Sequence, residues 1–566
     1  MRYLRDPRVG WCIFGALAVA YAVAHVAAAF TEGVNWDEYA LLWRVEKAVR
    51  TGVVDGGGRP GLTVIALYGL VDGCRSTESV VDAARVVWAI LTLGILAGVF
   101  VFVARALRDE PQRWGAAMLA TASLALVPVF MRWSLQVRSD QPAVLATVWA
   151  GVALLATRRR DLWAGIAGAM IGIGYLFSQK GLYVAGLVGV VVIGASWMRG
   201  ELVLRELRRA AFVVGSAIAS VVAYTIVVHV AFERARAGVT VGAGFDLFAW
   251  YREIVGFRVY VGMFETLLPL VLLVGLVLLG FARACRLRDD QLRRSFVVVA
   301  VLVVGVAVTL FHAAAFPYFW ITLGLFPAVA IGLGWPAART YFPRASLVVV
   351  AAALALFAWR AIPYRGETLV DTRAVQRESL DFVDGLPPAL RGFHPDGGLA
   401  CRRDPSPFPV YLRERVAKFA TSPDMGAGFI TELRGRPVAF IVRTYRLEKF
   451  PPDVRAFWAD HYVPYRGTVE LVGQRIHADT AGVRLMEIIV PERYRWISVR
   501  GDLVVGGVTL RPGETIALPV GTSRLAWHGA IDGVLVLAVD TPMSPARAPY
   551  YHFHPQMEIT GTRFRW

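Results

Sequence analysis

The chain has 566 residues, of which 56% are hydrophobic and only 18% are charged, and its mean hydropathy is +0.52. Ordinary globular domains do not reach these values, so the composition excludes a soluble globular protein and indicates a polytopic membrane protein. The formal net charge of +17 could suggest nucleic-acid binding, but Lys and Arg occur in short clusters between apolar runs, as the positive-inside rule expects. We therefore expect no nucleic-acid partner.

Eleven apolar runs are long enough to span a bilayer. The first resembles a secretory signal, but its length and the many runs that follow favour an uncleaved first helix. The segment Gly61 to Leu70 is too short to cross and is expected to dip into the interface or to re-enter. The predicted spans are residues 11–30, 82–104, 115–131, 142–157, 162–178, 182–198, 210–231, 262–282, 295–312, 318–335 and 345–361.

Arginine clusters such as 158–160 and 283–294 fall on one side of these spans, so we place that side and the N-terminus in the cytoplasm. An odd number of spans then puts the loop 31–81 and everything after 361 outside. In a bacterium this predicts an inner (plasma) membrane protein with a periplasmic C-terminal region. Of the four cysteines only Cys74 and Cys401 fall on that oxidising side, and we do not favour a disulfide between them.

From Pro363 the composition becomes that of a soluble region. Helical patterns at 372–385 and 453–462, with a strand-like run at 438–442, predict a small α/β unit. Short strands separated by Gly and Pro turns predict a β-sandwich-like unit. We expect a membrane domain at 1–361, an α/β domain at 362–480 and a β-sandwich-like domain at 481–566. The predicted strands are 483–490, 496–499, 503–505, 515–519, 524–527 and 534–539.

The first outer loop carries the adjacent acids Asp37 and Glu38, followed by a short amphipathic helix that is expected to lie in the membrane interface. We interpret the two carboxylates as candidate catalytic groups at the mouth of a membrane cavity. The alternative is helix capping, in which Asn35 or Asp37 is the N-cap and Glu38 lies in the first turn.

Other charges gather at the same predicted membrane face, where an ionisable side chain is costly unless it is paired, hydrated or used. Arg138, Lys180 and Arg258 are candidates for holding an anionic group such as a phosphate beside a carboxylate base. The alternatives are an interfacial anchor for Arg138 and snorkelling for Lys180. Asp140, two residues after Arg138, is a candidate substrate-positioning residue.

The loop at residues 316–320 is aromatic, which is more typical of an interfacial belt, and we keep His312 and Tyr318 as candidate substrate-positioning residues. His552 and His554 have a spacing compatible with metal binding, but a strand surface is favoured because no further ligand is close in sequence. The sequence requires no metal and leaves open whether a divalent cation takes part.

The order of these motifs resembles the GT-C glycosyltransferases, and within them the bacterial relatives of protein O-mannosyltransferases and of the lipid A aminoarabinose transferase. The resemblance covers mainly residues 1–361. The motifs are Asp37-Glu38 in the first outer loop, Arg138-x-Asp140 after the third span, Lys180-Gly181, Pro317-Tyr318 and a soluble outer C-terminus.

The resemblance implies a mainly α, GT-C-type membrane bundle in which Asp37 is the catalytic base, with Glu38 beside it. The donor would be a sugar on a polyprenyl phosphate, held by Arg138 and Lys180, and the acceptor a glycan, lipid or protein. We therefore expect an inverting membrane glycosyltransferase acting on the outer face. The alternative is a transporter or flippase for an anionic lipid-linked substrate, although no internal repeat is visible.

Overall fold

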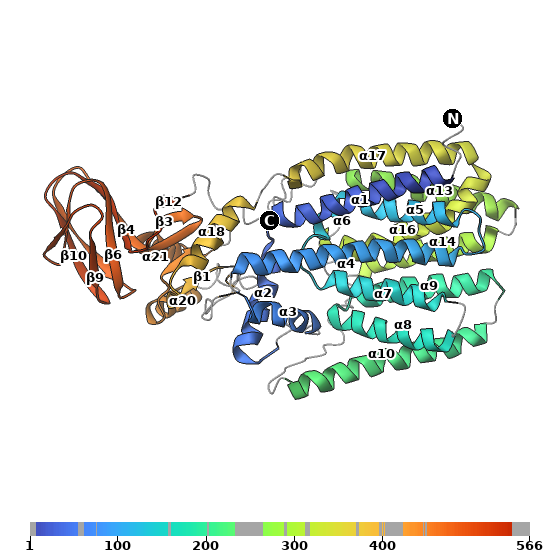
Figure 1. The fold of residues 1–566 in the computed structure, drawn as a ribbon, viewed down its shortest axis with the longest axis horizontal. Helices are drawn as coiled ribbons and strands as arrows, with labels where there is room; N and C mark the ends of the chain where they lie inside the picture. Colours follow the sequence, from blue (N-terminus) through green and yellow to red (C-terminus); the bar gives the residue numbers. More distant parts are fainter. Residues whose placement is uncertain are drawn as a thin grey trace.

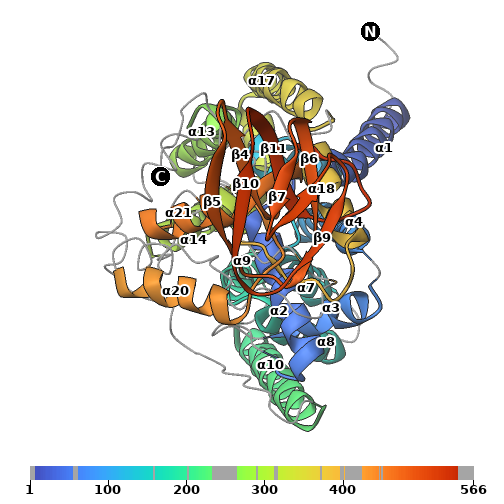
Figure 2. The same ribbon diagram turned by 90° about the vertical axis from the view of Figure 1, so that its left-hand side faces the viewer.

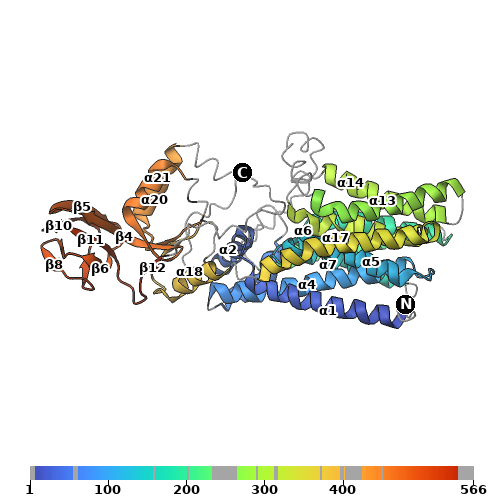
Figure 3. The same ribbon diagram turned by 90° about the horizontal axis from the view of Figure 1, so that it is seen from above.

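The computed structural model describes residues 7–54, 61–74, 76–156, 160–200, 203–231, 264–287, 291–311, 317–369, 373–395, 399, 401, 423–444, 447 and 450–545. The molecule is elongated, with a bundle of long helices at one end and a strand-rich region at the other (Figure 1). Seen from above, the short helix α2 (Trp36–Thr51) lies where the two regions meet (Figure 3).

In the described part of the chain, each predicted span coincides with one or more helices of the bundle, apart from a few residues at helix ends. The run 115–131 is divided into two helices, and the second begins at Pro128, whose fixed φ suits a first helical position. Among the described residues, seven helices are long and apolar enough to cross a membrane, so the chain is an integral membrane protein while the number of spans stays a prediction. The bundle helices are α1 (Pro7–Thr31), α4 (Thr77–Ala106), α5 (Arg113–Ala125), α6 (Pro128–Trp133), α7 (Asp140–Leu154), α8 (Arg160–Phe177), α9 (Gly181–Met198), α10 (Val203–Ala231), α13 (Phe264–Leu287), α14 (Gln291–Phe311), η2 (Pro317–Phe319), α15 (Trp320–Leu323), α16 (Leu325–Tyr341) and α17 (Pro343–Leu369).

Helices α8 and α10 approach closely along a row of glycines. A Cβ atom at Gly168 would lie 2.2 Å from the carbonyl oxygen of Val213, and one at Gly172 would lie 2.6 Å from that of Ala217. Glycines at this spacing therefore serve helix packing, as small residues commonly do in membranes.

The first outer segment folds as α2 and α3 (Leu62–Asp72), which pack against each other. The short helix α3 agrees with the prediction that residues 61–70 do not cross. The expectation that α2 lies in the lipid interface is wrong for its apolar side. Tyr39, Leu42 and Val45 are at most 1% exposed and belong to a hydrophobic core that includes residues of the C-terminal region, so protein covers them.

The C-terminal region contains all the helices and strands predicted for it, and also one helix (α20) and five strands (β1, β3, β4, β8 and β12) that the sequence patterns did not reveal. Its helices are α18 (Ala374–Gly385), α20 (Pro423–Gly435) and α21 (Pro452–His461). Its strands are β1 (Gly392–Phe393), β2 (Phe440–Val442), β3 (Tyr462–Gly467), β4 (Val469–Ala478), β5 (Gly482–Ile488), β6 (Glu492–Arg500), β7 (Leu503–Val505), β8 (Val508–Leu510), β9 (Thr515–Leu518), β10 (Gly521–Trp527), β11 (Ile531–Leu537) and β12 (Ser544–Pro545).

These strands form two sheets that share one core. The larger has the order β1-β2-β4-β11-β6-β9, with β3 and β12 attached beside β4, and the smaller has the order β5-β10-β7-β8. Buried side chains of both sheets, such as Trp496 and Leu525, belong to the same hydrophobic cluster. Viewed from the strand-rich end, the sheets lie over the end of the helical bundle (Figure 2). Because β4 pairs with both β2 and β11, the larger sheet continues across residues 480 and 481, where a domain boundary is predicted.

Helix α18 fastens the C-terminal region to the bundle. Its Asp384 accepts a hydrogen bond from the amide of Thr77 at 2.8 Å, and its Gln376 accepts one from the amide of Val34 at 2.7 Å. Just before the helix, Arg373 forms buried ion pairs with Glu78 and Asp82 of α4.

A disulfide also joins Cys74, after α3, to Cys401 of the C-terminal region, with the Cα atoms 5.8 Å apart. The expectation against this pairing is therefore wrong. Two thiols separated by 327 residues give no pairing signal in one sequence, and the docking of the C-terminal region on the first outer segment brings them together.

Candidate functional site

The site begins at the N-terminus of α2, where the chain forms a capping box. Asn35 is the N-cap, and its side chain accepts a hydrogen bond from the Asp37 amide at 3.0 Å. The Glu38 carboxylate accepts a hydrogen bond from the Asn35 amide at 2.9 Å. The capping alternative is thus correct for Asn35 and Glu38. The side chain of Asp37, in the first turn, is not the cap.

Glu38 is completely buried and held from three sides. Arg85 of α4 donates to both of its oxygens at 2.7 and 2.9 Å, and the Val137 amide donates at 3.0 Å. Burial raises the pKa of Glu38, but the Arg85 charge and these hydrogen bonds outweigh it and leave the pKa below its usual value. Because Glu38 is 0% exposed, it connects α2 to α4 and to the segment before Arg138 rather than facing a substrate.

Asp37 points to a different environment. Its carboxylate forms an ion pair with Arg138 at 2.5 Å, and its side chain is 22% exposed. Arg138 is held in place through its own backbone, because its carbonyl accepts a hydrogen bond from the Trp88 indole at 2.6 Å. The loop between α6 and α7 therefore carries a fixed guanidinium to the more accessible acid of the pair.

A second carboxylate–cation pair lies next to the first. Lys180, at the start of α9, donates to Asp140 at 2.9 Å, and Ser178 donates to the other Asp140 oxygen at 3.0 Å. Arg138 is 4.0 Å from Asp140 and so links the two pairs. We call Asp37, Arg138, Asp140 and Lys180 the charged cluster. Lys180 is only 12% exposed, so it is paired inside the protein rather than snorkelling into water.

The ring of Tyr318 forms one wall of the charged cluster. The Arg138 guanidinium lies 3.5 Å from the ring centroid, and the Lys180 ammonium lies 4.4 Å from it. An aromatic face attracts both cations and limits their rotation. Tyr318 therefore packs directly against the charged cluster, independently of any role of its loop at the membrane interface.

Six predicted site residues are therefore brought together from four separate segments of the chain: Asp37, Glu38, Arg138, Asp140, Lys180 and Tyr318. Arg258 and His312 lie outside the described residues, as do His552 and His554. In the described part of the chain, no group of three or more His, Cys, Asp or Glu side chains is placed to hold a metal ion.

Sequence reasoning assigned no role to two residues that position the site. Arg85 reads as one more charge at the outer end of a span, and only tertiary contact shows that it neutralises Glu38. Ser178 has no pattern of its own, although it directly precedes Gln179 and Lys180 after the end of α8.

The arrangement combines an accessible carboxylate with two cations close by. The carboxylate of Asp37 can accept a proton, while Arg138 and Lys180 can stabilise negative charge on a neighbouring group. Both cations are already matched by carboxylates. An incoming anion would therefore compete with Asp37 and Asp140 for them.

No protein-family model and no curated protein sequence matches this chain. Among solved structures, the chain is similar to ArnT from Cupriavidus metallidurans in the apo state, with a TM-score of 0.50 and 15% identity over 82% of this chain and 98% of that one. ArnT bound to undecaprenyl phosphate gives a TM-score of 0.48 at 16% identity, with the same coverage of both chains.

The oligosaccharyltransferase AglB from Archaeoglobus fulgidus, in complex with an inhibitory peptide and a dolichol-phosphate, gives a TM-score of 0.42. Its identity is 16% over 80% of this chain and 72% of that one. At these identities the similarity concerns the fold alone, and the likeness to apo ArnT carries it. Together with the long apolar helices and the strand-rich C-terminal region, that likeness shows that the chain has a GT-C fold.

Proposed function

We propose that this protein is a membrane glycosyltransferase that moves a sugar from a polyprenyl-phosphate donor to an acceptor on the outer face of the membrane, with inversion at the anomeric carbon. The observation that carries the proposal is the ion pair between Asp37 and Arg138, which joins a partly exposed carboxylate to a cation fixed by Trp88. Other support comes from the second cation beside it and from the GT-C fold. ArnT binds undecaprenyl phosphate, and the proposal extends that class of lipid to this chain.

The donor phosphate binds to Arg138 and Lys180. A guanidinium and an ammonium 2.5 and 2.9 Å from carboxylate oxygens are also placed for phosphate oxygens, which take the same donors. As the phosphate engages Arg138, the Asp37 carboxylate loses this partner and its oxygen becomes available to the acceptor group. Donor binding therefore prepares the base.

The chemical step is a single displacement. The acceptor O–H or N–H gives its proton to the Asp37 carboxylate, and the acceptor atom attacks the anomeric carbon. The bond from that carbon to the phosphate oxygen breaks, and its electron pair stays on the phosphate, where Arg138 and Lys180 neutralise the charge. Glu38 takes no proton in this scheme. It positions Asp37 by holding the first turn of α2 against Arg85.

The test is Asp37→Asn, which keeps the shape of the side chain but removes the proton acceptor. Transfer from a synthetic polyprenyl-phosphate sugar should fall about 10²- to 10⁴-fold, the usual contribution of a positioned general base, while the melting temperature stays unchanged. A matched control is Glu46→Gln on the same helix. The Glu46 carboxylate lies 3.5 Å from Arg50 and is not part of the charged cluster. A stable Asp37→Asn protein with full activity would remove Asp37 from the mechanism.

The same assay separates this proposal from lipid transport. A transporter would move the intact polyprenyl-phosphate sugar between leaflets of a vesicle and release no free polyprenyl phosphate. The glycosyltransferase releases one polyprenyl phosphate for each sugar transferred.

A further inference from the structure

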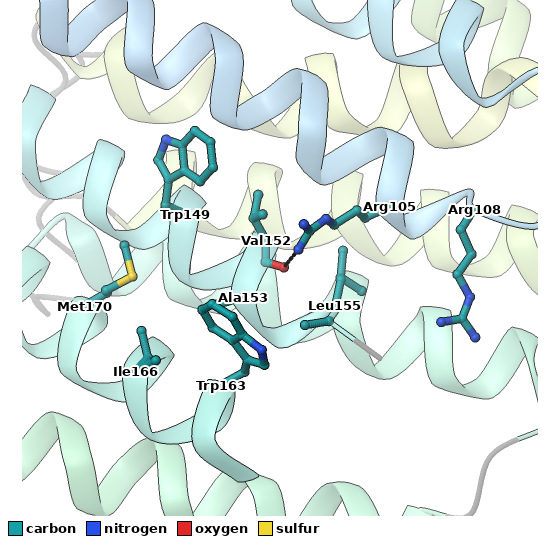
Figure 4. A pocket seen from close by; sticks show the side chains of 10 residues that line it. Arg105, Arg108, Trp149, Val152, Ala153, Leu155, Trp163, Ile166 and Met170 are labelled. Carbon is teal, nitrogen blue, oxygen red and sulfur yellow. Dashed lines mark hydrogen bonds between the residues drawn. The ribbon is translucent and has the colours of Figure 1, made fainter. Parts of the chain in front are cut away.

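A cavity of about 630 Å³ lies in the helical bundle between α4, α7 and α8 (Figure 4). It is formed by the last turn of α4 and the residues after it, the C-terminal half of α7 and the residues after it, and α8 as far as Met170. None of the charged-cluster residues lines it. It is therefore separate from the proposed active site and has no role in the displacement described above.

The cavity lies at the opposite end of the bundle from the charged cluster. Arg85, which contacts Glu38, and Arg105, which lines the cavity, are both in α4. At a rise of 1.5 Å per residue the helix between them covers about 30 Å, the thickness of the hydrocarbon core of a bilayer. The cavity thus opens at the membrane surface opposite Asp37.

One side of the cavity carries two arginines. Arg105 donates to the Val152 carbonyl at 2.9 Å, one of the last carbonyls of α7, and remains exposed. Arg108 is 3.5 Å from Asp109, whose side chain is 70% exposed. No acidic residue is among those that line the cavity in the described part of the chain, so its lining has a positive charge.

The other side is aromatic and apolar. Figure 4 shows Trp149, Ile166 and Met170 away from the two arginines, with Trp163 below them. The Trp149 indole donates to the Gly94 carbonyl at 3.1 Å, which fixes its ring. Trp163 and Ile166 are each 37% exposed, so apolar surface is accessible beside the arginines.

We propose that this cavity binds one anionic phospholipid from the leaflet opposite the proposed active site. The phosphodiester contacts Arg105 and Arg108, and the upper part of an acyl chain lies against Trp163, Ile166 and Met170. Basic pockets between membrane helices suit acidic headgroups, and tryptophan is favoured at the level of the headgroups. A zwitterionic lipid has a cationic group that this lining does not match. A free anion leaves the apolar side uncovered.

The experiment is native mass spectrometry of the delipidated full-length protein, titrated with phosphatidylglycerol or phosphatidylcholine. We expect one phosphatidylglycerol per chain, bound at least tenfold more tightly than phosphatidylcholine. Arg108→Gln should reduce this preference to less than threefold, and Arg105→Gln with Arg108→Gln should abolish it. The single variant keeps the test valid if loss of the Arg105–Val152 hydrogen bond disturbs α7.

Two matched controls define the site. Arg208→Gln removes an arginine that is 72% exposed and does not line the cavity, and should leave lipid binding unchanged. Trp163→Ala should weaken phosphatidylglycerol binding at least fivefold, whereas Trp197→Ala, at a similarly exposed tryptophan elsewhere, should not. Equal binding of the two lipids, displacement of the lipid by inorganic phosphate, or equal losses in Arg108→Gln and Arg208→Gln would each overturn the proposal.

Discussion

At the scale of single residues, Asp37 and Glu38 show how adjacent acids acquire different properties. Consecutive helical residues point about 100° apart, so Glu38 faces Arg85 inside the protein while Asp37 faces Arg138 at the cluster. The side chain of Glu38 is 1% exposed, and that of Asp37 is 22% exposed. One acid stabilises the position of the helix, and the other is available to a substrate.

Arg138 interacts with Asp37 and with the face of Tyr318, and both contacts use the planar guanidinium. Arg138→Lys should therefore lower kcat/KM for the donor by roughly 10- to 100-fold, the equivalent of one charge-assisted contact, without lowering the melting temperature. Donor titrations measure this effect. Arg208→Lys, at an exposed arginine, is the control and should match the parent protein. Normal donor kinetics in Arg138→Lys would reduce Arg138 to an interfacial anchor.

The sequence predicted all four members of the charged cluster but not their pairing. Asp37, Arg138, Asp140 and Lys180 stand out because charges at the ends of apolar runs are costly. Whether Lys180 reaches water or Asp140 depends on how α9 packs beside α7, and no local pattern contains that information. The same reason explains why the role of Arg85 was missed, because its partner is 47 residues away.

At the scale of elements, α2 is held by buried contacts on several sides. Glu38 binds Arg85 of α4, and the ring of Tyr39 lies 5.1 Å from that of His394, which follows β1. The amide of Val34, just before the helix, donates to Gln376 of α18. The position of the catalytic candidate therefore depends on the bundle and on the C-terminal region together.

Glu38→Gln should test the structural role of this helix. It leaves the buried Arg85 without its counter-charge, so we expect the free energy of unfolding to fall by about 3–5 kcal/mol. Asp161→Asn, at an ion pair with Arg208 in which both side chains are more than half exposed, should cost less than about 1 kcal/mol. Denaturant unfolding in detergent measures both. A Glu38→Gln protein as stable as the Asp161→Asn control would show that the Arg85 contact does not hold α2 in place.

His394 gives this junction a pH dependence. The ring is fully buried, and burial lowers its pKa from 6.5 to about 3. Below pH 6.5 the unfolded chain takes up a proton that the folded protein does not, so the stability that His394 contributes at neutral pH is lost as the pH falls from about 6.5 towards 3.

Between pH 6.5 and 5 this loss amounts to about 2 kcal/mol. The melting temperatures of the parent protein and of His394→Gln, measured over this range, should converge as the pH falls, because the variant lacks the titrating ring. His477→Gln, at a histidine whose side chain is 68% exposed, should follow the parent. Parallel curves for the parent and His394→Gln would contradict a buried neutral histidine.

At the scale of the whole molecule, hydropathy and strand alternation predicted the helices and most strands because both are local properties. They did not predict the eight-stranded sheet as a unit, because polar and apolar residues do not alternate regularly along β4, and its first six positions, Val469 to Gln474, are all buried. Nor did they predict that α18 and a disulfide attach the C-terminal region to the first outer segment.

The orientation in the membrane is the last prediction, and the disulfide makes it testable. Cys74 and Cys401 are joined, whereas Cys12 and Cys285 are free. A disulfide persists where the surroundings are oxidising, so from the Cys74–Cys401 bond we predict that the charged cluster and the C-terminal region lie outside the cytoplasm. Cys285, at the end of α13 beside an arginine cluster, is then expected on the cytoplasmic side.

A membrane-impermeant maleimide added to intact cells should therefore leave Cys285 unlabelled until the cells are lysed. Cys401 should be labelled from outside after mild reduction, and Cys401→Ser should instead leave Cys74 reactive without reduction. Mass spectrometry of tryptic peptides reads each site separately. Labelling of Cys285 in intact cells, together with protection of Cys401 after reduction, would invert the topology and place the proposed reaction in the cytoplasm.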